Sequence, residues 1–366
     1  MGFNCGIVGL PNVGKSTLFN ALTQTSLAES ENYPFCTIEP NTGRVSVPDS
    51  RLDNLANIVQ PQKIIHTQLE FVDIAGLVKD ASKGEGLGNK FLGHIREVDA
   101  IAHVIRCFDD ENITHVAGKV DPIRDIEIIE TELILADLDS LEKQASNLEK
   151  KIRGHDKSSK QKLYLIEKVY KSVSEGIPLR KINSLLPDEI VLLNELNLIT
   201  SKPIMYICNV SENDLLEGNK NTHSVLSKAN YDKCGFEIVS AQIEFELSQL
   251  NEKESQEYLF TLGLKEPSLK RVIKAGYGLL NLITFYTVGP NEARAWTIKN
   301  GANAPEAAGK IHSDFEKGFI KAETYSYNDF IGFKGEVGAK EAGKLRIEGS
   351  EYKVEDGDIF HFKFNV

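Results

Sequence analysis

The sequence predicts an α/β fold: a mainly parallel β-sheet with helices on both faces, a helical arm inserted into it, and a small α+β domain after it. Residues 1–125 contain short apolar runs that alternate with helical stretches, and two more apolar runs appear at 203–208 and 236–239. Continuous apolar runs separated by helices are typical of strands buried on both faces of a parallel sheet. The segment between, about 126–200, has helical periodicity, and from about residue 280 strand and turn signals dominate.

The chain length also predicts more than one domain, because 366 residues exceed the usual size of a single one. We place the α/β domain at 1–125 plus 201–279, the helical insert at 126–200, and the C-terminal α+β domain at 280–366.

The charge of the chain is unevenly distributed. The net charge of −11 argues against a general nucleic-acid-binding protein. Residues 142–181 nevertheless carry 11 Lys and Arg against 5 Asp and Glu, a balance of +6 that leaves −17 on the rest. The sequence therefore predicts a basic module on an acidic body.

Nothing in the composition suggests a membrane or an oxidising compartment. There is no run of about 18 apolar residues, and residues 1–4 lack the basic and apolar segments of a secretory signal. The 5 cysteines are scattered and never form C-x-x-C. We expect reduced thiols in a cytoplasmic protein that does not bind a membrane.

Residues 9–16 read G-L-P-N-V-G-K-S and fit G-x-x-x-x-G-K-[ST], the phosphate-binding loop. An apolar run at 5–8 precedes this loop and a helix-like run at 17–22 follows it, which is the required context. Its backbone N–H groups can surround a phosphate, and the helix N-terminus adds its positive dipole end. We expect Lys15 to bridge the β- and γ-phosphates of a nucleoside triphosphate and the Ser16 hydroxyl to bind Mg²⁺. The expected phosphate-binding residues are Asn12, Val13, Gly14, Lys15, Ser16 and Thr17.

A second motif, D-x-x-G, begins at Asp73 directly after the apolar run 69–72. This position places the Asp73 carboxylate near Mg²⁺, commonly through water, and the N–H of Gly76 near the γ-phosphate. Thr37 lies between the two motifs, where a threonine hydroxyl could complete the Mg²⁺ shell. Asp73, Ser16 and Thr37 are therefore the expected metal residues.

The helical insert shows a heptad seam. Its apolar residues recur at alternating spacings of four and three, at Ile134, Leu138, Leu141, Ala145, Leu148 and Ile152. Residues 154–159 break the pattern, and a second apolar stripe follows at 163–177. We interpret the insert as an antiparallel coiled-coil arm, which is either a solvated helix pair or a lever that touches RNA or a partner protein.

The base-recognition segment differs from that of GTP-binding proteins, which carry N-K-x-D after the corresponding strand. Here Asn209, Val210 and Glu212 stand in the sequence N-V-S-E after the apolar run 204–208, so the lysine is absent and the carboxylate is one methylene longer. A site built to pair with one base leaves polar groups unpaired with the other. We therefore expect ATP rather than GTP, read by Asn209 and the backbone around Val210. A further nucleotide loop is expected to contain Ser240 and Ala241.

The C-terminal domain is predicted from short strand signals. We predict strands at 282–288 and 295–298 and a helix at 304–315. We also predict two strands around an acidic turn within 351–365.

Together, the motifs G-L-P-N-V-G-K-S, P-F-C-T-I, D-I-A-G-L-V and N-V-S-E resemble those of the YchF/Obg-like ATPase family. The resemblance covers the whole chain. It implies a P-loop NTPase with a Ras-like G domain, an inserted coiled-coil domain and a C-terminal TGS domain, which is a β-grasp module. The activity it implies is slow, Mg²⁺-dependent ATP hydrolysis by a ribosome-associated protein.

The family carries an apolar residue, here Leu77, where Ras-like proteins place a glutamine that orients the attacking water. The segment 91–97 resembles the family segment whose histidine, here His94, is the candidate for that role. A monovalent cation such as K⁺ near Asn12 is an alternative. Lys15, Gly76 and His94 are thus the expected catalytic residues.

The sequence is compatible with two functional hypotheses. The first is a nucleotide-dependent ATPase switch that binds the ribosome, a ribosomal subunit or RNA through the basic arm and the TGS-like domain. The second is a module that binds either GTP or ATP, docks on RNA or protein, and has little turnover of its own. A monomer is expected in both cases.

Overall fold

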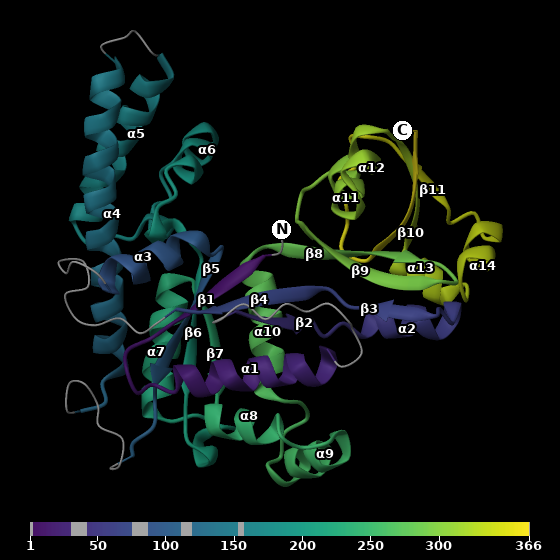
Figure 1. Cartoon of the computed structure of the whole chain (residues 1–366), viewed down its shortest axis with the longest axis horizontal. Helices are drawn as coiled ribbons and strands as arrows, with labels where there is room; N and C mark the ends of the chain where they lie inside the picture. The colour runs from purple at the N-terminus through teal and green to yellow at the C-terminus, as the bar shows by residue number, and fades with distance from the viewer. Residues whose placement is uncertain (1–2, 31–41, 75–86, 111–118, 153–156, 366) are drawn as a thin grey trace. The chain divides into compact units, whose positions relative to one another are not determined.

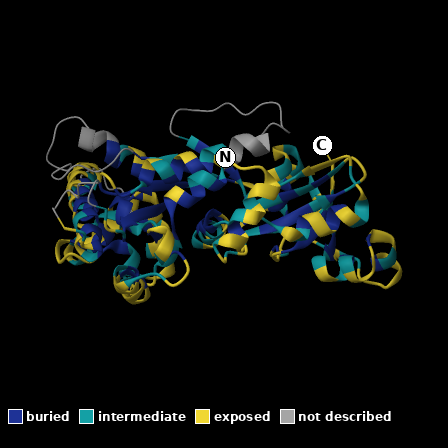
Figure 2. Cartoon of the chain, turned by 90° about the horizontal axis from the view of Figure 1, so that it is seen from below, coloured by how far each residue is buried: buried dark blue, intermediate teal, exposed yellow. Residues whose placement is uncertain are grey.

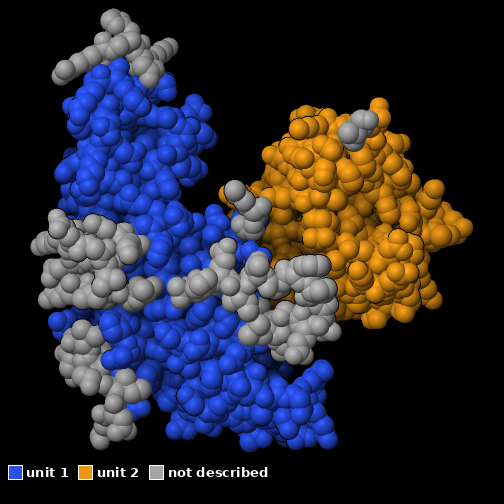
Figure 3. Space-filling view, in the orientation of Figure 1, with its two compact units in different colours: residues 1–45, 70–276 blue, residues 46–69, 277–366 orange. Residues whose placement is uncertain are grey.

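The chain folds into two compact units (Figure 3). Unit 1 comprises Met1–Val45 and Glu70–Gly276, and unit 2 comprises Ser46–Leu69 and Tyr277–Val366. The computed structural model describes residues 3–30, 42–74, 87–110, 119–152 and 157–365.

Unit 1 contains a six-stranded sheet of order β2-β4-β1-β5-β6-β7 (Figure 1). All neighbours from β4 to β7 pair in parallel, and β5 and β6 are buried at every residue. Figure 2 shows buried segments, in dark blue, with exposed segments, in yellow, around them. This arrangement confirms the predicted α/β class, since strands covered on both faces need continuous apolar runs. The strands are β1 (Asn4–Val8), β2 (Thr42–Ser46), β4 (Gln68–Asp73), β5 (Ala100–Arg106), β6 (Ile204–Asn209) and β7 (Gly235–Val239).

Helices surround this sheet and form the insert. The helices are α1 (Lys15–Ser30), α3 (Leu87–Glu97), α4 (Pro122–Ile152), α5 (Lys157–Ser174), α6 (Pro187–Glu195), α7 (Lys220–Asp232), α8 (Ala241–Leu247), α9 (Glu252–Thr261) and α10 (Ser268–Leu279). Three 3₁₀ turns join them: η1 (Leu179–Lys181), η2 (Ile199–Ser201) and η3 (Glu212–Asp214). Among the residues that the structure describes, no helix is both long and apolar enough to cross a membrane.

Helices α4 and α5 lie side by side (Figure 1). Their shared apolar cluster contains most of the predicted heptad residues, namely Ile134, Leu138, Leu141, Ala145 and Leu148. Helix α5 contributes buried Leu165, Ile166, Val169 and Val173, and residues of 179–198 add to the same cluster. The first predicted stripe therefore lies largely in this cluster, whereas only the middle of the second stripe does, because Ile177 lies beyond α5 and is exposed. A coiled-coil geometry stays a prediction.

Unit 2 contains a second six-stranded sheet, of order β11-β10-β12-β8-β9-β3. Strand β12 is parallel to β8 and antiparallel to β10, and β8 is antiparallel to β9. The strands are β3 (Lys63–Ile65), β8 (Leu282–Val288), β9 (Glu292–Lys299), β10 (Phe319–Ser326), β11 (Arg346–Glu348) and β12 (Asp358–Phe364). The helices are α2 (Ser50–Val59), α11 (Ala304–Ile311), α12 (Ser313–Lys317), α13 (Tyr327–Gly332) and α14 (Glu336–Glu341).

Two features of unit 2 differ from the sequence-based expectations. Residues 351–365 form one strand rather than two, because Lys353 makes only an isolated bridge to Asn303 and pairing resumes at Asp358. Residues 46–69, which the sequence placed with 1–125, fold with the C-terminal residues, and β3 pairs with β9. Local propensity could not indicate this, because a strand signal does not say which sheet the strand joins.

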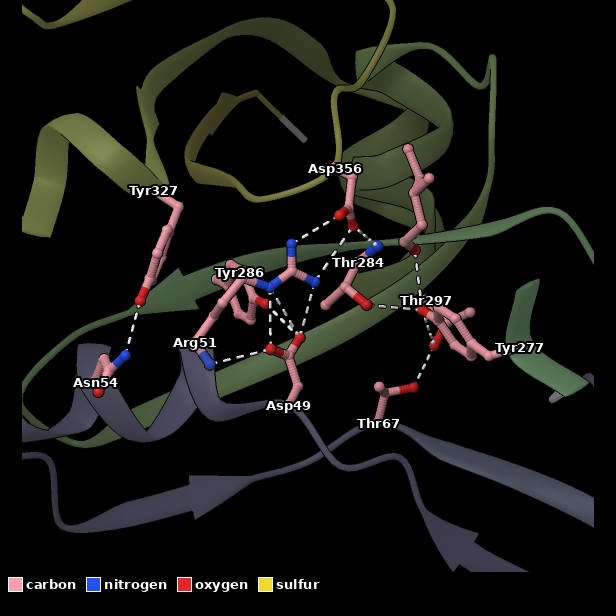
Figure 4. Close-up of polar contacts among 11 residues, drawn as sticks. Asp49, Arg51, Asn54, Thr67, Tyr277, Thr284, Tyr286, Thr297, Tyr327 and Asp356 are labelled. Atoms are coloured by element: carbon pink, nitrogen blue, oxygen red, sulfur yellow. Dashed lines mark hydrogen bonds and ion pairs between the residues drawn. The ribbon is translucent and has the colours of Figure 1, made fainter. Parts of the chain in front are cut away.

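A polar network explains why residues 46–69 belong to unit 2. Arg51 donates to Asp49 at 2.9 Å and to Asp356 at 2.7 Å, and Tyr286 donates to Asp49 (Figure 4). Asp356 also accepts from the backbone N–H of Thr284 at 2.9 Å. Burial alone would raise the pKa of Asp49, yet the hydrogen bonds from Arg51 and Tyr286 lower it below its ordinary value. The carboxylate is therefore held ionised between segments far apart in the sequence.

Candidate functional site

The predicted phosphate loop connects β1 to α1 at the carboxyl edge of the sheet in unit 1. Asn12 and Gly14 have left-handed backbone angles, with φ of 63° and 91°. A Cβ on Gly14 would lie 2.1 Å from Nδ2 of Asn209, so only glycine fits. The first amides of α1 follow directly, and Leu18 N–H bonds to Gly14 O at 3.0 Å. The loop thus has the tight curvature that phosphate binding requires.

Lys15 and Asp73, which come from separate motifs, form an ion pair. The parallel register of β1 and β4 sets Asp73 opposite Ile7, and Lys15 opens the helix that follows β1. Both side chains are largely buried, with 10% and 17% exposed. The structure therefore brings together the ammonium predicted to neutralise phosphates and the carboxylate predicted to lie near Mg²⁺.

Asn209 joins three loops at this edge. Its Nδ2 donates to Val13 O at 2.9 Å, and its Oδ1 accepts from Ala241 N–H at 2.9 Å. The residue is 6% exposed. Its amide is thus engaged on both sides with backbone groups, and it holds the phosphate loop against the Ala241 loop. The sequence expected Asn209 to read the base, and the structure shows it positioning the loops.

The other residues that the sequence predicts to recognise the base lie beside Asn209. Val210 is buried and its N–H bonds to Val239 O at 2.9 Å, while Glu212 is exposed at the start of η3. Ser240 and Ala241 are buried at the start of α8. The segments that the sequence selected therefore meet at the ends of β6 and β7, next to the phosphate loop.

Ser16 is exposed at the start of α1, and Thr17 is half-buried beside it. A triphosphate with Mg²⁺ fits this set of residues, because hydroxyl and carboxylate oxygens are hard ligands that Mg²⁺ prefers. No group of three or more His, Cys, Asp or Glu side chains that could hold a metal occurs among the described residues. The ion would thus depend on Ser16, Asp73 and the phosphates of the nucleotide together.

Three expected residues are not placed at this site. Thr37 and Gly76 lie outside the described residues. His94 is the eighth residue of α3, and its side chain is exposed. It forms no hydrogen bond or ion pair with any other residue that the structure describes. Its predicted role in orienting water stays a prediction.

The sequence reasoning missed Asn219 and Asp214, which hold the segment that carries Glu212. Asn219 is the N-cap of α7, and its Nδ2 donates to Asp214 Oδ2 at 2.7 Å. An asparagine directly before a helical stretch is a known N-cap signal, so the sequence could have predicted the start of this helix. The hydrogen bond from Asn219 to Asp214 could not be predicted from the sequence.

Comparisons with known proteins agree over the full length. The chain is 56% identical to "Ribosome-binding ATPase YchF" of Haemophilus ducreyi and 56% identical to the protein of the same name from Escherichia coli O157:H7. It is 52% identical to the Bacillus subtilis protein of that name. In each case 100% of both chains is covered.

Two family models match separate parts of the chain. One, described as "50S ribosome-binding GTPase", matches residues 4–168, and the other, YchF-GTPase_C, described as a protein of unknown function, matches residues 282–365. The solved structure of the Schizosaccharomyces pombe YchF GTPase superposes with a TM-score of 0.89 at 42% identity. It covers 99% of this chain and 98% of its own. From its fold, its phosphate loop and these full-length similarities, the chain belongs to the YchF family.

Proposed function

We propose that this protein is an ATPase that binds ATP with Mg²⁺, hydrolyses it slowly and uses the bound nucleotide to switch its binding to the ribosome. The observation that carries this proposal is the curved phosphate loop with Lys15 paired to Asp73 beside it. A buried ammonium and carboxylate that face each other can exchange partners when an anion and a cation bind together.

The chemistry requires positioning and charge neutralisation more than covalent steps. Lys15 and the loop amides would hold the β- and γ-phosphates, and Ser16, Thr37 and Asp73 would hold Mg²⁺. When bound, Mg²⁺ supplies positive charge that stabilises the negative charge on the transferred phosphoryl group. Gly76 would donate its N–H to the γ-phosphate. Either His94 or a K⁺ ion near Asn12 would assist the attacking water, and slow turnover follows from the missing glutamine.

The preference for ATP over GTP rests on residues 209–212. Guanine presents a donor pair that an aspartate accepts in GTP-binding proteins, and here Glu212 stands in its place. The names of relatives differ on this point, since the bacterial proteins are called ATPases and the yeast structure is called a GTPase. The base is therefore the part of the proposal that most needs a test.

Equilibrium binding of fluorescent ATP and GTP analogues with Mg²⁺ tests the base preference. We expect wild-type protein to bind ATP at least about tenfold more tightly than GTP. The double variant Val210→Lys/Glu212→Asp, which restores the GTP-type motif, should shift toward GTP. Because Val210 is buried, Glu212→Asp alone is the second variant. Equal binding of both nucleotides by wild type would refute the preference and favour a promiscuous binding module.

The ribosome is the proposed partner because the bacterial relatives are named ribosome-binding and a matching family model is described in the same way. In this chain the arm α4–α5 supplies exposed basic side chains, Lys150, Lys151, Lys160 and Lys171. Unit 2 has a mixed sheet with helices, which is consistent with a TGS-type β-grasp domain. We propose that the protein is a cytoplasmic monomer that docks through both.

Charge reversal on the arm tests this docking. The variant Lys150→Glu/Lys151→Glu should weaken co-sedimentation with ribosomal subunits about tenfold, more at low salt than at high salt. The control Lys253→Glu/Lys265→Glu makes the same charge change at exposed positions elsewhere in unit 1. If both variants weaken sedimentation equally, the arm has no specific role and only net charge matters.

A further inference from the structure

The loop between β6 and α7, residues 210–218, is held at both ends by one residue of the neighbouring strand connection. Cys107 N–H donates to Asn209 O at 2.8 Å, where the loop begins. Cys107 O accepts from Nδ2 of Asn219 at 2.8 Å, where the loop ends. The backbone of Cys107 therefore sets the distance between the two ends.

The interior of the same loop is held by Asp214. Its carboxylate accepts from Ser211 Oγ at 3.1 Å and from Asn219 Nδ2 at 2.7 Å. Gly218 N–H donates to Asp214 O at 2.8 Å, and Leu215 is buried beneath the turn. The loop is thus braced across its middle as well as at its ends.

The oxygen and the nitrogen of the Asn219 side-chain amide make different interactions. Oδ1 accepts from the N–H groups of Asn221 and Thr222 at 2.9 Å and 3.1 Å, which caps α7. Nδ2 makes the two contacts to Cys107 and Asp214. An aspartate at this position would keep the cap and lose the brace.

Glu212 lies inside this braced loop, at the first position of η3. Its side chain forms no hydrogen bond or ion pair with other described residues, so the backbone alone places it. Val210 N–H, at the start of the loop, donates to Val239 O at 2.9 Å. The loop therefore begins beside the end of β7, which leads directly into Ser240 and Ala241 at the start of α8.

We propose that Asn219 and Asp214 are positioning residues for recognition of the nucleotide base. The Cys107–Asn219–Asp214 brace sets the backbone of residues 210–212 against the Ala241 loop, which gives the base a preformed edge. Without the brace the segment must order when the nucleotide binds, and that ordering weakens affinity. This inference rests on the proposed function, in which residues 209–212 set the preference for the base.

The test compares Asn219→Asp with a matched control, Asn303→Asp. Asn303 is the N-cap of α11, and the same substitution there keeps a cap in unit 2, whereas the phosphate loop belongs to unit 1. The probes are fluorescent ATP, fluorescent GTP and inorganic tripolyphosphate, each with Mg²⁺. Tripolyphosphate fills the phosphate loop but has no base, so it reports damage that reaches the loop itself.

We expect Asn219→Asp to weaken ATP binding about tenfold, because a buried backbone acceptor loses its donor and two carboxylates face each other. Tripolyphosphate binding should stay within about twofold of wild type, and Asn303→Asp should change neither. If Asn219→Asp does not fold, Asp214→Asn is the second variant. It keeps an acceptor for the Ser211 hydroxyl but places the side-chain amides of residues 214 and 219 next to each other.

Two results would overturn the inference: an unchanged ATP affinity, or equal losses for ATP and tripolyphosphate. The proposed base preference is judged separately on wild-type protein. If wild type binds ATP and GTP equally while Asn219→Asp weakens both relative to tripolyphosphate, the preference fails and the positioning role stands.

Discussion

The two units each contain a cluster of polar side chains that are at least partly shielded from solvent, and the clusters differ in how completely their groups are paired. In unit 2, Asp49 accepts hydrogen bonds from Arg51 and Tyr286, and Arg51 also reaches Asp356 (Figure 4). In unit 1, Lys15 has Asp73 as its one ion-pair partner among the described residues, beside a loop in left-handed conformation. A cluster satisfied within the chain holds segments together, whereas charges that can exchange partners can bind a ligand.

The strongest test of this difference is Lys15→Ala. We expect ATP hydrolysis to fall about 10²–10³-fold, because the variant loses a charged group that acts where negative charge develops. Thermal stability should change little, since one ion pair at the edge of the sheet contributes less to the free energy of unfolding than the packing of the sheet does. Steady-state hydrolysis and circular dichroism melting measure the two effects. A large loss of thermal stability with unchanged ATP hydrolysis would make the Lys15–Asp73 pair structural and remove the distinction.

The reciprocal test is Arg51→Met. We expect it to lower the free energy of unfolding of unit 2 by about 2 kcal/mol, because Asp49 and Asp356 lose their shared partner. ATP binding should stay unchanged. The chain has 1 tryptophan, Trp296 in β9, so its fluorescence during urea unfolding reports on unit 2 alone. Loss of ATP affinity in this variant would contradict the division of roles.

The smallest expected effect is the pH dependence of the same variant. The folded pKa of Asp49 is lowered, so its contribution is present above the ordinary aspartate pKa of about 4 and is lost as pH falls through the lowered value. The stability difference between wild type and Arg51→Met should therefore narrow on acidification below about pH 4. Urea unfolding followed at Trp296 measures it, and a constant difference across that range would mean that Asp49 is not the partner that matters.

The prediction from sequence succeeded where the signal was local or periodic. Residues 9–16 lie next to one another in the chain, and the buried strands and the helical stripes repeat at the periods of their secondary structures. The strands were placed within a few residues of their observed bounds, whereas α4 begins well before the first predicted stripe. Lys15 and Asp73 form an ion pair and Asn209 bonds to the phosphate loop, because parallel strands end at one edge of a sheet, and the roles of these residues toward a nucleotide stay predictions.

By itself, then, the sequence determined the α/β class, the phosphate loop and the family. Tertiary structure alone decided that residues 46–69 join unit 2, through contacts such as Arg51 to Asp356 across 305 positions. It also decided that the amide of Asn209 joins loops and that Asn219 braces the segment carrying Glu212. The physical reason is the same in each case. A local pattern shows which conformation a segment adopts, but a hydrogen bond between distant residues depends on where the whole fold brings them.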